Sequence, residues 1–257
     1  MSNPWDLMYE DFVWIFSHPY EVLVEFGLRN TILAIRLKHV KDDKAPKSEF
    51  NLLYWSNWRG ILSQIMWFLV TLPVFIFYPL LAMKALERPY GLLWDIVESI
   101  LQRSFEIDTM SVRQATNYIL PMLRDKKTEN VRLIAHSQGC IIANLVVKRI
   151  YTELSYTKEQ GYLSKLSVHT FANISREFRN PDGLINCIEH YANRRDPVAV
   201  RGVINNINDK RTIGEIFIND LRNGGKGHLF NSFYSLNLVD YWSARGGESV
   251  LLNLPGK

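Results

Sequence analysis

Cysteine is scarce in this chain, which has only Cys140 and Cys187 among its 257 residues. Two cysteines are too few for a disulfide scaffold, so we expect two buried, reduced thiols. No spacing of Cys, His, Asp and Glu is typical of a metal site, and the glycine-rich run 224–227 lacks the spacing of a phosphate-binding loop. We therefore expect neither a metal nor another cofactor.

An excess of charge of one sign is also missing. The chain has 30 Lys and Arg against 26 Asp and Glu, which leaves a formal net charge of +4 at pH 7, spread along the sequence. No basic run alternates with aromatic residues as a nucleic-acid surface would require, so a nucleic acid is not an expected partner. A modest attraction to an anionic membrane surface is the more natural expectation.

What the chain does have is enough apolar sequence for a folded domain. Hydrophobic residues make up 47% of it and charged residues 22%, a composition typical of globular proteins. The length suits one α/β domain with an N-terminal appendage. From about residue 110 to 240, strand-like and helix-like patterns alternate, which predicts a mostly parallel sheet with helices on both faces.

A serine between small residues gives the strongest functional signal. The apolar run 131–135 leads into Ser137, and a helical pattern follows at once, which is the layout of a nucleophile elbow. The tight turn requires small residues at Ala135 and Gly139. It would expose the Ser137 hydroxyl above the sheet and direct the backbone N–H of Gln138 toward a developing oxyanion. The alternative is an ordinary strand–turn–helix of any α/β protein.

A serine hydroxyl needs a positioned base, and in α/β-hydrolases the partners follow in the order Ser, Asp or Glu, then His. Asp196 follows a strand-like run, 188–192, on a loop stiffened by Pro197, at the sheet edge where ligands bind. An aspartate in a simple turn before proline is the alternative for Asp196. His228 follows the glycine-rich stretch 223–227 and is the candidate base.

The other histidines fit this role less well. His136 lies beside Ser137, and we expect it to point the opposite way and to be buried under the sheet. The rest lie in strand runs typical of packed core histidines or far upstream with no motif around them: His169, His190, His18 and His39. We therefore predict that His228 takes the proton from Ser137 while Asp196 orients the imidazole, and that water hydrolyses an acyl-enzyme.

Five segments resemble the fungal-type serine esterase/lipase-like α/β-hydrolases: residues 90–98, 134–139, 170–173, 190–193 with Asp196, and 227–229. The resemblance covers roughly residues 88–240. It implies an α/β-hydrolase fold, hydrolysis of a carboxyl ester, and a catalytic triad of Ser137, Asp196 and His228, but it fixes no substrate.

One part of that family's pattern is missing. A glycine-containing loop that would supply the second oxyanion N–H has no counterpart before Tyr90, and losing one such donor typically costs about 10²–10³ in turnover. The chain is then a weak enzyme, completes the hole in another way, or is an inactive relative that serves as a membrane-tethered binding or structural partner. A further alternative is that the N-terminal third of the chain reflects a rearranged or truncated coding sequence.

A long uncharged segment occupies that place. Residues 61–83 carry no charge and are bracketed by Arg59 and Lys84, and their length suits a bilayer-spanning helix. Prolines such as Pro73 are tolerated in membrane helices. The alternative is a pair of buried β-strands broken at Pro73. We predict a transmembrane helix over 61–83.

The predicted organisation has two parts. Residues 1–87 form an amphipathic and membrane-anchor segment, and residues 88–257 form an α/β-hydrolase-like domain, truncated at its N-terminal strands. The predicted protein is a single-pass, membrane-associated serine hydrolase that cleaves a carboxyl ester, with a lipid among the candidate substrates.

Overall fold

The computed structural model describes residues 3–17, 66, 92–220 and 227–254, in two compact units, 1–105 and 106–257. In the first unit, α1 (Pro4–Ser17) packs against α6 (Leu92–Phe105). The rings of Trp5 and Phe105 meet edge to face, with centroids 4.9 Å apart. A buried ion pair between Asp11 and Arg103 also joins the two helices. The predicted boundary near residue 87 stays a prediction.

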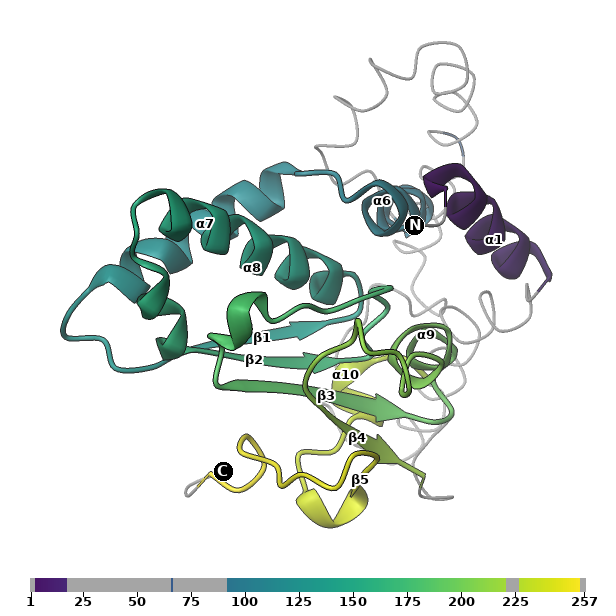
Figure 1. The fold of residues 1–257 in the computed structure, drawn as a ribbon. Coiled ribbons are helices and arrows are strands. Elements are labelled where there is room, and N and C mark those ends of the chain that lie inside the picture. Colours follow the sequence, from purple (N-terminus) through teal and green to yellow (C-terminus); the bar gives the residue numbers. More distant parts are fainter. Residues whose placement is uncertain (1–2, 18–65, 67–91, 221–226, 255–257) are drawn as a thin grey trace, which may run out of the picture. The chain divides into compact units, whose positions relative to one another are not determined.

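The second unit is built on a five-stranded sheet (Figure 1). Its strands are β1 (Val131–His136), β2 (Leu166–Phe171), β3 (Cys187–Asn193), β4 (Glu215–Asn219) and β5 (Trp242–Ser243), and they lie in that order. The first four are parallel, and β5 is antiparallel to β4. This confirms the predicted mostly parallel sheet. Because parallel strands end at the same edge, the segments after β1, β3 and β4 meet there.

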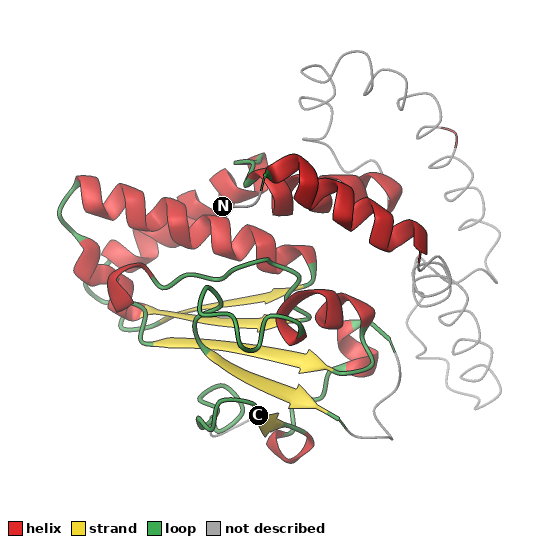
Figure 2. Ribbon diagram, turned by 45° about the vertical axis from the view of Figure 1, so that its right-hand side comes forward, coloured by secondary structure: helices red, strands yellow, loops and turns green. Residues whose placement is uncertain are grey.

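Two long helices cover one face of this sheet, α7 (Met110–Arg124) and α8 (Gln138–Tyr156) (Figure 2). Side chains alternate between the two faces of a strand, so Val131 and Ala135 point to the same face. Both are buried in one cluster with Leu123 of α7 and Ile150 of α8. This apolar layer fixes the angle at which α8 leaves the end of β1.

Aromatic side chains and the C-terminal segment pack against the opposite face. Phe171, Tyr191 and Phe217 stack across β2, β3 and β4, with successive centroids 4.8 and 5.2 Å apart. The Tyr191 hydroxyl lies 2.7 Å from Ser249 Oγ, which ties the C-terminal segment to the sheet. The connecting segments contain short helical turns: η2 (Gln160–Lys165), η3 (Pro181–Gly183), α9 (Pro197–Ala199), η4 (Val200–Ile204), α10 (Phe230–Phe233) and η5 (Leu238–Asp240).

Gly202 allows η4 to pack directly on the chain beyond β2. A Cβ built on Gly202 would lie 1.9 Å from the carbonyl oxygen of Asn173, which is closer than any real contact. We expect Gly202→Ala to lower the free energy of unfolding by about 3 kcal/mol or more, since overpacking against backbone has no side-chain relief. Thermal unfolding checks this. Gly161→Ala is the control, because a Cβ there meets nothing within 4 Å, and it should leave the Tm nearly unchanged.

The predicted transmembrane segment, 61–83, lies outside the described residues apart from Met66. Among the helices that the structure does describe, none is both long enough and apolar enough to cross a bilayer.

Candidate active site

Ser137 occupies a strained turn between β1 and α8. Its backbone has φ 58° and ψ −125°, a conformation that a residue with a side chain seldom adopts. Such strain costs of order 1–3 kcal/mol and persists only where surrounding contacts impose it. Here the carbonyl of Phe171 accepts from the Ser137 N–H at 3.0 Å and from the Cys140 thiol at 3.3 Å. Both contacts anchor the turn to the end of β2.

The two small residues beside the turn face each other. A Cβ built on Gly139 would lie 3.8 Å from the Cβ of Ala135, which is an ordinary contact distance. The tight turn predicts small residues at both positions. The geometry adds that an alanine would fit at 139, so the demand on this position is less strict than predicted.

Asp196 lies in the loop after β3, where the sequence placed it. Its carboxylate is fully buried and accepts a hydrogen bond from the Val198 N–H at 2.8 Å, as the N-cap of α9. Asn193, at the end of β3, shapes the loop by accepting from the Arg195 N–H at 2.9 Å. The Asn193 amide also donates to the carbonyl of Phe233 at 3.2 Å, which joins this loop to α10.

His228 follows β4 and leads into α10. Its side chain is 6% exposed. The preceding Gly227 lies against the ring of Phe233, and a Cβ on Gly227 would come within 2.4 Å of that ring. The backbone therefore approaches the ring closely at Gly227, while Gly224 and Gly225 lie outside the described residues.

The structure brings the three predicted side chains into one hydrogen-bonded chain. His228 Nε2 lies 2.7 Å from Ser137 Oγ, and His228 Nδ1 lies 2.8 Å from Asp196 Oδ2. A carboxylate only accepts, so Nδ1 carries the proton and Nε2 is left to accept from the serine hydroxyl. This geometry can transfer a proton from the hydroxyl to the imidazole while the carboxylate stabilises the resulting charge.

The position predicted for His136 is wrong. His136 is not buried under the sheet but lies against His228, with ring centroids 4.6 Å apart and planes 30° from parallel. Its Nε2 lies 2.9 Å from the backbone carbonyl oxygen of His228, so Nε2 must be the donor. Burial, with a further contribution from His228, lowers the pKa of His136 to about 4. His136 is therefore neutral at pH 7 and does not repel a protonated His228.

Sequence reasoning missed Tyr234. Its hydroxyl donates to Asp196 Oδ2 at 2.5 Å, the carboxylate oxygen that also contacts His228. The available signal was an aromatic-rich run directly after His228, but only the folded chain shows which of those side chains reaches the carboxylate.

Gln138, the predicted oxyanion donor, is the first residue of α8. Its backbone N–H belongs to the first turn of a 19-residue helix, where N–H groups point along the axis toward the N-terminus. The part of the chain before Tyr90, where a loop with the second oxyanion donor is expected, lies outside the described residues apart from 3–17 and Met66.

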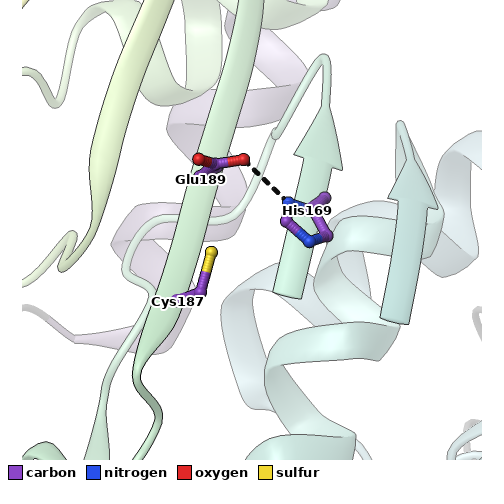
Figure 3. Close-up of side chains that lie close together, drawn as sticks. All are labelled: His169, Cys187 and Glu189. Atoms are coloured by element: carbon purple, nitrogen blue, oxygen red, sulfur yellow. Dashed lines mark hydrogen bonds and ion pairs between the residues drawn. The ribbon is translucent and has the colours of Figure 1, made fainter. Parts of the chain in front are cut away.

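One group of described side chains could offer ligands to a metal ion: His169, Cys187 and Glu189, whose ligand atoms lie within 4.8 Å of one another (Figure 3). Glu189 is already engaged, because it accepts from His169 at 2.9 Å, from Tyr191 at 2.7 Å, and from the backbone N–H groups of Val250 and Leu251. Burial alone would raise the pKa of Glu189, but these hydrogen bonds outweigh it and lower that pKa. The carboxylate already accepts four hydrogen bonds, two of them from the C-terminal segment, so we assign the group to fastening that segment.

The remaining predictions for histidines and thiols can be compared directly. His169 and His190 are fully buried within strands, as expected, and burial lowers the pKa of His190 to about 4. Both cysteines are free. Cys140 is buried, whereas Cys187 is only half-buried, and burial raises the pKa of the Cys187 thiol to about 11. Burial also raises the pKa of the Cys140 thiol, so both thiols stay protonated at neutral pH.

Comparison with protein families gives one match. Residues 100–177, which contain α7, β1, Ser137 and α8, match the model of a family described as "Putative serine esterase (DUF676)". This confirms the predicted resemblance to a serine esterase/lipase-like family, on the segment that contains the elbow. No curated protein and no solved structure matches the chain.

Proposed function

We propose that the chain is a serine hydrolase that cleaves a carboxyl ester through an acyl-enzyme. The observation that carries the proposal is the hydrogen-bonded chain from Ser137 through His228 to Asp196, with Ser137 in a strained elbow. The three residues follow in the order expected for an α/β-hydrolase, and each lies beyond the carboxyl end of a parallel strand. We extend the proposal to the fold, which we infer to be α/β-hydrolase-like.

In the proposed reaction, Ser137 Oγ attacks the ester carbonyl carbon as His228 Nε2 takes its proton. The negative charge on the carbonyl oxygen meets the N–H of Gln138 at the start of α8. The C–O bond to the alcohol then breaks, and His228 returns the proton to the leaving alkoxide. Water, activated by His228 in the same way, hydrolyses the acyl-Ser137 ester and regenerates the serine. Asp196 keeps a proton on His228 Nδ1 throughout and stabilises the imidazolium that forms.

An acid-quench experiment tests this function. The full chain is mixed with p-nitrophenyl acetate, quenched in acid within the first turnover, and digested. We expect an acetyl group on the peptide that contains Ser137, because the acid unfolds the protein and so stops deacylation. A second sample is quenched after the ester is consumed, and the adduct should have disappeared. Acetylation confined to lysines or to another serine would contradict the proposal.

The alternative is a hydrolase-fold protein without catalysis, which serves as a binding or structural partner. It is favoured by the lack of a glycine-containing loop before Tyr90 that could give a second oxyanion donor. The two functions differ in the rate with activated esters. A second-order rate no higher than that of a Ser137→Ala variant would support the inactive partner.

Membrane association and a lipid substrate remain proposals that depend on the sequence of residues 61–83, where no charged side chain interrupts the apolar run. If this segment spans a bilayer, the full chain should stay with the membrane fraction when peripheral proteins are stripped at alkaline pH. Release into the supernatant would contradict it.

A further inference from the structure

Tyr234 contacts a buried charge at the centre of the site. Its hydroxyl lies 2.5 Å from Asp196 Oδ2, and both residues are buried. Burial, followed by the nearby Asp196 charge, raises the pKa of the Tyr234 hydroxyl well above its usual value. The phenol is therefore protonated and acts as the donor, which makes this a charge-assisted hydrogen bond.

A fully buried carboxylate requires several donors to remain charged. Among the described residues Asp196 has three donors: the Val198 N–H on Oδ1 at 2.8 Å, and the Tyr234 hydroxyl and His228 Nδ1–H on Oδ2. The Val198 bond holds one oxygen from the backbone. The Tyr234 bond is the side-chain contact that fixes the other oxygen, the one that faces His228.

The tyrosine ring is itself held in place. It stacks on Phe230 with planes 11° apart and meets Phe171 edge to face at 5.9 Å and His136 at 5.7 Å. Because the ring packs against three aromatic side chains, the position of its hydroxyl is fixed before any substrate binds. Tyr234 also lies only six residues after His228 in the chain. One short segment therefore bears both side chains that donate to Asp196 Oδ2.

We propose that Tyr234 is a positioning residue for the hydrolase reaction: its hydroxyl fixes the Asp196 carboxylate in the orientation that aims His228 at Ser137. This role rests on the proposed function. Without the hydroxyl, the carboxylate can rotate about its Cβ–Cγ bond or admit water, and the imidazole loses its fixed direction. Tyr234 acts through Asp196, so its contribution should disappear when Asp196 is absent.

The test is Tyr234→Phe, with Tyr241→Phe as the matched control. Tyr241 is also buried, but its hydroxyl donates to the Ser235 carbonyl at 2.9 Å and does not touch the three site residues. We expect Tyr234→Phe to lower kcat for an activated ester roughly 10-fold, as for the loss of one hydrogen bond to a charged group, with KM within about twofold. Tyr241→Phe should keep the wild-type kcat. Rates are measured well below the Tm of each variant and divided by the folded fraction from circular dichroism.

A second pair of variants separates positioning from mere stability. Asp196→Ala is compared with Asp196→Ala/Tyr234→Phe by the rate of labelling with excess fluorophosphonate. Equal rates in these two support the role, because the tyrosine then has nothing left to position. A further 10-fold fall in the double variant, or equal losses in Tyr234→Phe and Tyr241→Phe, overturns it. If the wild-type chain has no Ser137-dependent hydrolysis, the proposed function itself fails. This result differs from the two outcomes that overturn only the role of Tyr234.

Discussion

Replacing Ser137 with alanine is expected to lower kcat/KM for an activated ester by roughly 10⁴-fold or more, because removing the nucleophile of a coupled serine–histidine pair removes the covalent route altogether. The fold should tolerate the change, since alanine is smaller and the anchoring N–H of residue 137 to the Phe171 carbonyl is kept. Initial rates on a chromogenic ester, with thermal unfolding of the same samples, measure both effects.

Ser175→Ala is the matched control for this variant. Ser175 is buried, and its Oγ has no hydrogen-bond partner among the described residues. Its loss should leave both the rate and the Tm close to those of the wild type. Equal activity in Ser137→Ala and Ser175→Ala would show that hydrolysis, if present, does not use Ser137.

Replacing His228 with alanine is expected to have a similar effect, roughly 10⁴-fold or more on kcat/KM, because the serine then has no base within reach. His136→Ala is the informative comparison. The His136 imidazole stacks on the ring of His228, and its Nε2 donates to the backbone carbonyl oxygen of His228 at 2.9 Å. Losing the His136 side chain shifts the base, His228, without removing it. We therefore expect kcat/KM of His136→Ala to fall by no more than about 100-fold.

The comparison of the two histidine variants separates their roles. With both proteins folded by circular dichroism, a large loss for His228→Ala and a small one for His136→Ala fits the proposed assignment. Equal losses would mean that His136 takes part in proton transfer itself, and the base would have to be reassigned.

The local parts of the site could be predicted from the sequence because each is encoded in a few neighbouring residues. Strand-forming residues in the run 131–135 precede Ser137, and apolar residues at helical spacing follow it. The structure has β1 and α8 at these two places. Asp196 was placed by a strand followed by Pro197, and the N-cap of α9 is found at that point. These signals depend on backbone geometry over short distances.

The features of the site that the sequence could not predict depend on contacts between segments far apart in the chain. His136 was expected to be buried under the sheet, but the sequence does not say which segment covers this histidine. The covering segment comes from His228, 92 residues later. Tyr234 reaches Asp196 across 38 residues for the same reason. A tyrosine in an aromatic-rich run is typical of core packing, and only its contact with a buried carboxylate distinguishes it.

The assembly of the sheet shows the same limit. Period and composition predicted parallel strands, yet they could not show that Glu189 would hold the C-terminal segment through the backbone N–H groups of Val250 and Leu251. A glutamate in a strand run gives no sign of a partner about 60 residues away. The His169–Glu189 contact was missed on the same ground, although both histidines in strands were correctly expected in the core.

The most direct measurement is covalent labelling of the full chain with a fluorophosphonate probe, which reacts with a serine only when a neighbouring base makes it nucleophilic. The account predicts that folded wild-type protein is labelled on the peptide containing Ser137, and that Ser137→Ala is not labelled under the same conditions. Wild-type protein that is folded and yet unlabelled, or labelling that persists in Ser137→Ala, would contradict it.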